Sequence, residues 1–358
     1  MTPPGPQGER LRQAALHVLK GDAPGAAARV AGYSGAEAFR RDCLRLLHAA
    51  PEALRQWAGR GSYRIEYGGP FHLLQTLGYL GRDPGNLAER VREDRYIRQF
   101  PVSGGVVRVE LHLGERSCTV EARRPRSAGQ ALELHERLVR FLGLSQPLNA
   151  FYRAVGGHPV MGPLVRRFTG VRIPQLPTLW EALCWAVIGQ QINLAFAYRL
   201  RNRLIAVSHG FPPDTAPDEP LAFPLPRQVL DLRPADVLAQ QFSRQKARYL
   251  LGLAEACEAG DLAGLEPGDH DWTAVEARLL AQTGLGPWSA AYAMMRGLGY
   301  MDGLPVGDSG LRTALQRSFT LNSPPTVREQ EELMAPFRPY RGLATYYLWK
   351  SLANTSTD

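Results

Sequence analysis

The chain has 358 residues, 44% of them hydrophobic, with a formal net charge of +8 and an isoelectric point near 9.5. This length leaves room for two or three domains with a large buried core, and the basic charge suits a polyanionic partner. The four cysteines are far apart and form no C-x-x-C pair, which argues against zinc and against an iron–sulfur cluster. We expect no signal peptide and no membrane span, because no apolar run approaches about 18 residues.

The N-terminal part is expected to be helical. Residues 1–60 begin with a tail rich in proline and glycine. Apolar residues then recur at helical spacing in 11–16 and 26–31, a turn follows at 32–34, and a further helix is expected over about 36–47.

From Ser62 the pattern changes to the alternation that is typical of strands. Tyr63, Ile65 and Tyr67 share one face, and alternation returns over 107–113 and 118–122. Helical stretches are predicted near 71–80 and 129–142. From about Leu148 onward the pattern is almost entirely helical, with breaks at 172–177, 210–226 and 322–325, of which 211–226 is the expected mobile loop.

The stretch Thr283–Asp308 carries the most chemistry. Gly284 and Gly286 flank Leu285 just before a helix expected at Pro287, so this turn can direct free amides and the positive end of a helix dipole towards a phosphate. An ordinary connection between two helices is the alternative.

The helix that follows places aromatic residues on one face. Trp288, Tyr292 and Met295 are spaced i, i+4 and i+7, which favours either a stacking surface or simple core packing. Asp308 precedes another amphipathic helix, where it is a candidate catalytic acid or an ordinary N-cap.

These residues carry a resemblance. TGLGPWSA at 283–290 and PVGDSGLR at 305–312, together with 183–192, 243–247 and 337–342 in the same order, resemble the helix-hairpin-helix-GPD superfamily of base-excision DNA glycosylases. Within this superfamily, the chain resembles more specifically the 3-methyladenine DNA glycosylase II (AlkA) type. The resemblance runs from about residue 61 to about 352. It implies a mainly α fold in which a small antiparallel α+β domain (61–147) precedes a helix-hairpin-helix-GPD glycosylase domain (148–358).

Residues 1–60 carry a second, smaller resemblance. Residues 27–34 with 39–41 and 50–55 are similar to one helix-turn-helix of AraC-type regulators, a unit that is also fused to glycosylases in Ada–AlkA proteins. We interpret 1–60 as a remnant of such a unit. Two alternatives are open: it is an auxiliary DNA contact, or it does not bind DNA.

The glycosylase resemblance implies a site for an everted, alkylated base. Asp308 would stabilise the developing oxocarbenium sugar and orient or deprotonate a water. One carboxylate suffices, since a cationic base departs without a general acid. Trp288, Tyr292, Tyr340 and Tyr79 would form the base pocket, in which cation–π attraction offsets a flipping cost of about a few kcal/mol. The family has tryptophan where this chain has Tyr340.

DNA contacts are implied along the same motifs. The candidates are Gln190, Gln191, Lys246, Gly284, Gly286, Ser289 and Ala290. Gln191 stands where the family can hold an apolar wedge, and as a polar residue it can still fill the gap left by the flipped base. Lys246 is expected at a phosphate, or else on an exposed basic face. The main-chain carbonyls of Leu280, Gln282 and Gly284 would hold a monovalent cation (Na⁺ or K⁺); no other cofactor is expected.

Lysine positions favour a monofunctional enzyme. The chain has only Lys20, Lys246 and Lys350, and none lies in the hairpin motif where relatives with lyase activity place their amine. We therefore expect a cytoplasmic, nucleoid-associated monomer that releases 3-methyladenine and 7-methylguanine from double-stranded DNA without cutting the strand. Two alternatives stay open: a non-catalytic regulator that binds damaged DNA, and a glycosylase for oxidised or deaminated purines.

Overall fold

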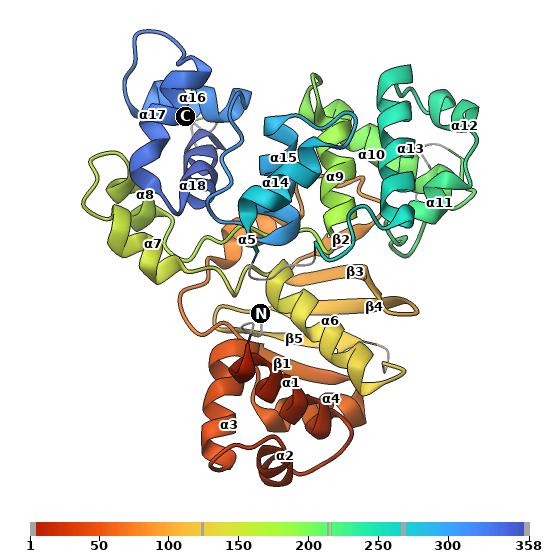
Figure 1. Cartoon of the computed structure of the whole chain (residues 1–358), viewed down its shortest axis with the longest axis vertical. Coiled ribbons are helices and arrows are strands. Elements are labelled where there is room, and N and C mark those ends of the chain that lie inside the picture. Colours follow the sequence, from red (N-terminus) through yellow and green to blue (C-terminus); the bar gives the residue numbers. More distant parts are fainter. Residues whose placement is uncertain (1–4, 123–124, 213–214, 216, 266–269, 354–358) are drawn as a thin grey trace.

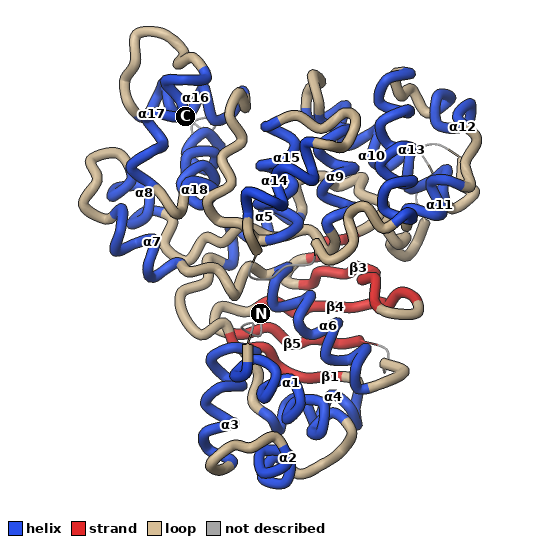
Figure 2. The backbone as a smooth tube through the Cα atoms, in the orientation of Figure 1, coloured by secondary structure: helices blue, strands red, loops and turns tan. Residues whose placement is uncertain are grey.

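The computed structural model describes residues 5–353 except 123–124, 213–214, 216 and 266–269. A sheet and the N-terminal helices form one end of the molecule, and a larger group of helices forms the other (Figure 1). Figure 2 shows that strands are confined to one sheet near the middle, which confirms the expectation of a mainly α fold with an α+β N-terminal part. None of the helices in the described stretches combines the length and apolar character that crossing a bilayer requires.

Four helices and a π-helical turn precede the sheet. They are α1 (Pro6–Leu19), α2 (Pro24–Val30), α3 (Ala36–Asp42), η1 (Cys43–Leu47) and α4 (Pro51–Arg60). Proline near the start of α1, α2 and α4 suits helix initiation, because the first amides of a helix have no internal partner.

These first helices share a core with the sheet. Leu11 of α1 and Trp57 of α4 belong to the same buried cluster as Tyr63 and Leu111 of the sheet. Trp57 stacks on Tyr63 with ring centroids 4.5 Å apart. Residues 1–60 and the sheet therefore share one hydrophobic core. The separate unit predicted at 1–60 stays a prediction.

The sheet has five strands in the order β1-β5-β4-β3-β2, and all neighbours are antiparallel. Its strands are β1 (Ser62–Glu66), β2 (Glu89–Arg92), β3 (Arg95–Val102), β4 (Gly105–Leu113) and β5 (Ser117–Ala122), with α5 (Leu73–Leu80) after β1 and α6 (Ala128–Phe141) after β5. The alternation in the sequence predicted β1, β4 and β5. It did not predict β2 and β3, whose arginines obscure the apolar face.

The remaining helices form two cores. Their bounds are α7 (Leu148–Val155), α8 (Met161–Arg167), α9 (Leu179–Gly189), α10 (Leu194–Ser208), α11 (Pro226–Leu230), α12 (Pro234–Ala239), α13 (Arg244–Ala259), α14 (Trp272–Leu280), α15 (Pro287–Ala293), the π-helical turn η2 (Met294–Leu298), α16 (Ser309–Ser318), α17 (Val327–Met334), the 3₁₀ turn η3 (Ala335–Phe337) and α18 (Arg341–Ala353). One core gathers α9, α10, α13 and α14, and the other gathers α7, α8 and α16 to α18.

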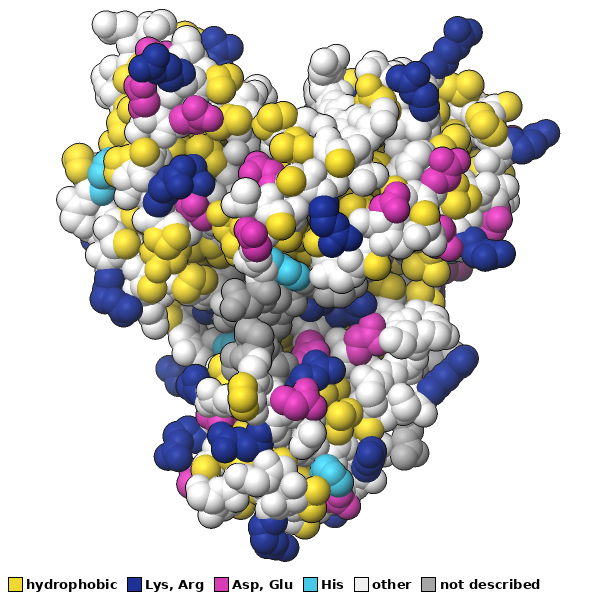
Figure 3. Space-filling model, viewed as in Figure 1, with side chains coloured by type: hydrophobic (Ala, Val, Ile, Leu, Met, Phe, Trp, Pro, Cys, Tyr) yellow, Lys and Arg dark blue, Asp and Glu magenta, His cyan; other side chains and the backbone are white. Residues whose placement is uncertain are grey.

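The segment from α15 to η2 contributes to both cores. Ala290 and Met294 face the first core, whereas Tyr292 and Met295 face the second. Figure 1 places α14 and α15 between the two groups of helices, and Figure 3 shows the surface notched between these groups. A side chain on α15 can therefore reach the seam between the two cores.

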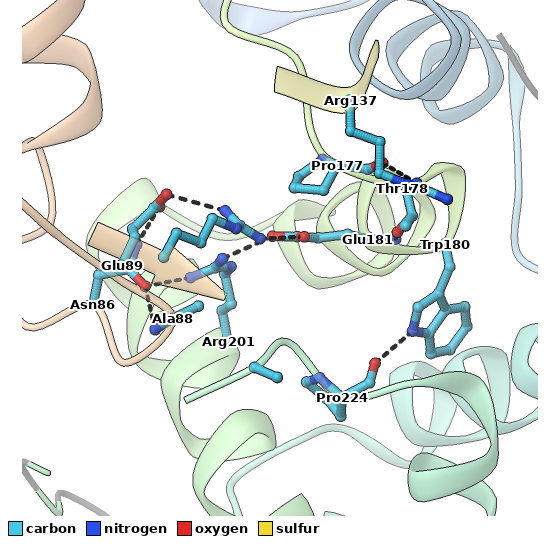
Figure 4. Close-up of polar contacts among 12 residues, drawn as sticks. Asn86, Ala88, Glu89, Arg137, Pro177, Thr178, Trp180, Glu181, Arg201 and Pro224 are labelled. Atoms are coloured by element: carbon cyan, nitrogen blue, oxygen red, sulfur yellow. Dashed lines mark hydrogen bonds and ion pairs between the residues drawn. The ribbon is translucent and has the colours of Figure 1, made fainter. Parts of the chain in front are cut away.

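Buried ion pairs join the sheet to the helical part. Arg98 of β3 pairs with Glu181 of α9, and Arg201 of α10 binds the same carboxylate at 2.9 Å (Figure 4). Arg98 also pairs with Glu89 at 3.0 Å, and Arg201 donates to Asn86 at 2.7 Å. Burial alone would raise the pKa of Glu89, but Arg98 and Arg201 lower it below its usual range. Because separating any partner would leave an uncompensated buried charge, this network fixes the sheet against α9.

The loop expected to be mobile, 211–226, lies partly outside the described residues, at 213–214 and 216. Its described second half is attached to the sheet side. The amide of Leu221 donates to the carbonyl of Leu87 at 2.7 Å, and Gln99 donates to the carbonyl of Pro220 at 2.7 Å.

Candidate active site

The Asp308 carboxylate is the centre of the site. Its Oδ1 accepts hydrogen bonds from the Leu311 amide at 2.7 Å and from Trp349 Nε1 at 2.9 Å. Its Oδ2 accepts one from Trp288 Nε1 at 3.1 Å. Asp308 is therefore the N-cap of α16 and is also oriented by two indoles. These three donors are neutral, so they hold the carboxylate in place without cancelling its charge.

The aromatic face of α15 lies beside this carboxylate. Trp288 and Tyr292 stack with ring centroids 5.4 Å apart and an interplanar angle of 21°. Trp288 is half-buried, and Tyr292 is only 6% exposed. Burial raises the pKa of Tyr292 to about 12, although Arg296 opposes the shift, so the phenol remains protonated at neutral pH. Its oxygen accepts a hydrogen bond from Arg296 Nη1 at 3.4 Å.

Tyr79 of α5 reaches this group from the sheet domain. Its ring has Arg82 Cζ 3.9 Å, Arg296 Cζ 5.1 Å and Lys350 Nζ 5.5 Å from its centroid. Tyr346 packs edge-on against it at 5.9 Å. The ring that the sequence assigned to a cationic base is thus already surrounded by cationic side chains of the protein.

Tyr340 packs against the same core as Trp288 and Tyr292, and its ring meets Phe151 of α7 edge-on with centroids 5.9 Å apart. The structure therefore brings Asp308, Trp288, Tyr292 and Tyr79 into one chain of contacts, through Arg296, and gives Tyr340 no recorded ring contact with Trp288 or Tyr292.

Sequence reasoning missed Trp349, Arg296 and the cations around Tyr79. Trp349 and Tyr346 are three positions apart on α18, and Arg296 is four positions after Tyr292. Both spacings place neighbours on one helix face, so the sequence pattern could have indicated these residues. Met295 lies in the same core as Tyr292 and is fully buried, with Trp288 packed against that core, so the expected shared face is present and its lower part is core packing.

The hairpin between α14 and α15 needs only one of its glycines. Gly284 has φ 95°, and a Cβ there would lie 2.3 Å from the Tyr249 ring. Gly286 is extended with φ −108°, and a Cβ there would meet no atom within 4 Å. The unusual backbone conformation of this turn is therefore supplied by Gly284, whereas Gly286 has an ordinary extended conformation and open surroundings.

Two predicted DNA contacts on α15 have hydrogen-bond partners within the protein. The Ala290 amide already donates to the Gly286 carbonyl at 2.9 Å as the first bond of the helix, so it is not a free amide. The Ser289 side chain is buried, and its Oγ accepts a hydrogen bond from Gln190 Nε2 at 3.1 Å. Gln190 Nε2 also donates to the Gly284 carbonyl at 2.9 Å and thus ties the end of α9 to the hairpin.

The loop after α9 exposes Gln191. This residue has φ 55°, a left-handed conformation that is uncommon outside glycine, and its side chain is exposed. Lys246 of α13 holds the same loop from behind, since its Nζ donates to the carbonyl of Ile188 and, at 2.8 Å, to that of Gln190. Burial lowers the pKa of Lys246 to about 8. Its ammonium is thus engaged at the C-terminal end of α9, where a positive charge is favoured.

The carbonyls expected to hold a monovalent cation are partly engaged. The Gln282 carbonyl accepts from the Leu285 amide at 3.1 Å, and the Gly284 carbonyl accepts from Gln190. Each carbonyl has a second lone pair, so the oxygen donors are compatible with such an ion.

Comparison with known proteins places this geometry in a family. Residues 184–339 match the HhH-GPD superfamily of base excision DNA repair proteins, and residues 62–177 match the AlkA N-terminal domain. The chain is 31% identical over 288 residues to a DNA-3-methyladenine glycosylase of Bacillus subtilis, covering 79% of this chain and 94% of the relative.

A longer relative and a solved structure agree with this placement. A probable bifunctional transcriptional activator/DNA repair enzyme AlkA of Mycobacterium tuberculosis is 29% identical over 360 residues, covering 96% of this chain and 70% of the relative. The fold matches a 3-methyladenine DNA glycosylase of Archaeoglobus fulgidus with a TM-score of 0.69 at 21% identity, covering 83% of this chain and 100% of that one. The chain belongs to the HhH-GPD superfamily of base excision DNA repair proteins, in the AlkA type that carries its own N-terminal domain.

Proposed function

We propose that the chain is a DNA glycosylase that hydrolytically releases alkylated bases, including 3-methyladenine and 7-methylguanine, from duplex DNA. The observation that carries this proposal is the Asp308 carboxylate, held between the indoles of Trp288 and Trp349 and next to a stacked aromatic pair. The Bacillus subtilis relative, which bears the name DNA-3-methyladenine glycosylase, supports the substrate class.

The reaction needs a negative charge beside the sugar. The bond between C1′ and the base nitrogen breaks, its electron pair leaves on the base, and positive charge develops on the sugar. Asp308 stabilises that charge and accepts the proton of the water whose oxygen bonds to C1′. A base that carries a positive charge departs as a neutral molecule, so one carboxylate is sufficient.

The base must leave the helical stack to reach this carboxylate. Eversion costs about a few kcal/mol, and stacking against Trp288, whose neighbour is Tyr292, would return part of that cost. Gln191 would fill the gap in the duplex, because it is exposed on a loop that Lys246 and Gln190 hold rigid. The open surroundings of Gly286 would admit a phosphate.

Strand cleavage is not part of this proposal, because no lysine lies in the hairpin motif. Lys350 is the residue to test, since its amine lies 5.5 Å from the Tyr79 ring centroid and burial lowers its pKa to about 8. Borohydride should trap no covalent complex with lesion-containing DNA. A trapped complex that Lys350→Met abolishes would overturn the monofunctional proposal and assign the lyase amine.

Four further expectations remain proposals. They are a monovalent cation at the hairpin carbonyls, a monomeric state, a cytoplasmic location at the nucleoid, and DNA contacts by residues 1–60. The Mycobacterium tuberculosis relative, called a transcriptional activator as well as a repair enzyme, supports testing the last of these.

The decisive experiment is a base-release assay. Purified protein is incubated with methylated duplex DNA, and the released bases are separated and quantified. We expect 3-methyladenine and 7-methylguanine to appear, and Asp308→Asn to remove the activity while DNA affinity is kept. Tight binding to the methylated duplex without any release would instead favour the damage-binding regulator.

A further inference from the structure

The segment that leads to Asp308 is attached at both ends to one helix. At its start, the side chain of Asp302 forms an ion pair with Arg341, the first residue of α18. At its end, Asp308 accepts a hydrogen bond from Trp349 of the same helix. Residues 302–308 thus bridge two positions of α18 that lie roughly 12 Å apart along the helix axis.

The contact at the start of this segment has a defined direction. Arg341 donates to Asp302 from Nε at 2.9 Å and from Nη2 at 2.6 Å, so both carboxylate oxygens are engaged. The main-chain amide of Arg341 also donates to Oδ1 of Asp302, at 3.1 Å. We refer to these three hydrogen bonds as the Asp302 clasp. A bidentate pair between arginine and a carboxylate fixes the angle as well as the distance between its partners.

The Asp302 clasp also completes the N-terminus of α18. The first amides of a helix have no partner within the helix. Here the Arg341 amide is bound by Asp302, and the Gly342 amide donates to the Met301 carbonyl at 2.8 Å. The negative charge of Asp302 is favourable at this position, which is the positive end of the helix dipole. The start of α18 is therefore joined to the segment that leads to Asp308.

Glycines bring α18 and this segment close together at both ends. A Cβ at Gly342 would lie 2.8 Å from the Met301 carbonyl oxygen. A Cβ at Gly310 would lie 3.1 Å from Oδ1 of Asp308 and 3.3 Å from the ring of Trp349. Because both contacts lack free space, a displacement of α18 at its start is transmitted to the hydrogen bond at its other end.

Apolar packing does not fix the register of α18 in the same way. The side chains of Leu343, Tyr347 and Leu348 are buried in the core. The attraction between apolar side chains is non-directional, whereas the Asp302 clasp is directional. The hydrogen bond from Trp349 to Asp308 needs a defined register, because N–H···O bonds tolerate a range of only about 0.5 Å.

Asp302 lies on a different side of α15 from the proposed site. Together with Arg341 it lines a cavity to which α15 contributes Pro287. Within the part of the chain that the structure describes, neither Asp308 nor Trp288 lines that cavity. Asp302 is also only 7% exposed. An effect of Asp302 on the reaction would therefore pass through other residues, and not through contact with DNA.

We propose that Asp302 and Arg341 are positioning residues, which set the register of α18 so that Trp349 orients the catalytic carboxylate of Asp308. The inference rests on the proposed function, in which Asp308 stabilises the sugar cation. Without the clasp, the indole of Trp349 donates to Oδ1 for a smaller fraction of the time, so the carboxylate is less often in the productive orientation. The rate of the chemical step falls, while DNA binding is kept.

The first test measures base release from methylated duplex DNA by Asp302→Asn and Arg341→Met. Asp302→Asn keeps an oxygen for the Arg341 amide but loses the charge of the pair. Each variant should lower kcat by about fivefold with KM within about twofold of wild type, which is the pattern for an interaction that acts in the chemical step. The loss should be smaller than that of Trp349→Phe, which removes the donor itself.

Combining Asp302→Asn with Trp349→Phe distinguishes positioning from a general structural effect. If Asp302 acts through Trp349, the double variant should have the kcat of Trp349→Phe alone, because no indole is left to position. Independent effects would instead multiply the two losses, and that result would overturn the inference. Wild-type kcat in both Asp302→Asn and Arg341→Met would overturn it as well.

A second measurement does not depend on activity. NMR follows the exchange of the Trp349 indole N–H with solvent, and the signal is assigned by its absence in Trp349→Phe. Asp302→Asn should speed this exchange by about fivefold or more, because the indole is hydrogen-bonded for less of the time. The indole of Trp180, which donates to the Pro224 carbonyl at 2.8 Å, is the internal control and should be unchanged. Unchanged exchange at Trp349 would overturn the inference.

Arg137→Met is the matched control for Arg341→Met. Arg137 pairs with Glu133 on α6 at 2.9 Å, and its side chain is 15% exposed, the same fraction as that of Arg341. Its removal should lower the melting temperature and leave both kcat and the exchange of Trp349 unchanged. Thermal melting of every variant confirms that it is folded. Equal losses of kcat in Arg137→Met and Arg341→Met would assign the effect to stability alone.

The outcomes separate this inference from the proposed function. A wild-type protein that releases no base would contradict the proposed function, and the exchange of the Trp349 indole would still decide whether Asp302 positions it. If wild type releases bases but Asp302→Asn changes neither kcat nor this exchange, the positioning inference is overturned and the glycosylase assignment stands.

Discussion

The two sides of the proposed site differ in charge. On the α16 side, the Asp308 carboxylate accepts hydrogen bonds from the neutral groups of Leu311, Trp288 and Trp349. On the α5 side, Arg82 and Lys350 bring positive charge to the ring of Tyr79. Charge placement, and not aromatic surface alone, therefore distinguishes the two sides.

Removing the negative charge on the α16 side should have the largest effect. Asp308→Asn keeps the size of the side chain and an oxygen for the Leu311 amide, but it cannot stabilise a cationic sugar or take a proton. We expect base release to fall by about 1000-fold. Single-turnover release measures the rate, and fluorescence anisotropy should show DNA affinity within about threefold of wild type. A residual rate within tenfold of wild type would contradict the assignment of Asp308 as the catalytic carboxylate.

Breaking the buried ion-pair network between the sheet and α9 should have the second-largest effect. Glu181→Gln leaves Arg98 and Arg201 without their shared carboxylate, at sites where the three side chains are at most 5% exposed. We expect the free energy of unfolding to fall by about 3 kcal/mol, measured by urea denaturation. Glu219→Gln is the control, because its pair with Arg108 is 62% exposed on the glutamate side and should contribute about 0–1 kcal/mol. Equal losses in both variants would contradict a special role for the buried network.

Trp349 should affect catalysis through the orientation of Asp308. Trp349→Phe removes the indole donor to Oδ1 and leaves a ring in place, so kcat should fall by about tenfold with little change in KM. Trp180→Phe is the matched control, because its indole donates to the Pro224 carbonyl at 2.8 Å, away from Asp308. The control should lose stability and keep its kcat. If both variants lose kcat alike, the effect of Trp349 is general packing.

The smallest expected effect is a pH dependence on the α5 side. Burial, followed by the charge of Arg82, lowers the pKa of Lys350 to about 8, and Tyr79 and Tyr346 face the same amine. Because the pKa is lowered, the ammonium loses its proton as the pH rises from 7 to 9. Repulsion of a cationic base then weakens, and release of 3-methyladenine by the wild type relative to its release by Lys350→Met should rise by about threefold.

The Lys350→Met variant isolates this dependence. Lys246 also has a pKa of about 8, but it binds carbonyls at the end of α9 and remains in the variant. Release of 3-methyladenine by Lys350→Met should lack the rise that this lysine contributes between pH 7 and 9. A rise of equal size in the variant would assign the dependence to another group.

Much of the fold followed from local patterns, and the failures have physical causes. Alternation predicted β1, β4 and β5, because their apolar residues occupy every second position. It missed β3, where Arg98 is buried in an inward position, since only its partners Glu89 and Glu181 make that burial possible. The shared face of Trp288, Tyr292 and Met295 was predicted from helical spacing, whereas the π-helical turn that contains Arg296 was not, because such a turn has no simple periodic signal.

The sequence by itself determined the local devices of this protein: the left-handed turn at Gly284, the aromatic pair of Trp288 and Tyr292, and the acid at the start of α16. Each depends on backbone geometry or on spacing along one helix. Only the tertiary structure decided that Trp349 orients Asp308 and that Arg82 and Lys350 meet at Tyr79. Packing of the sheet domain against the helices brings these residues together. Local periodicity reports only neighbours along one helix or strand, so it cannot indicate such contacts.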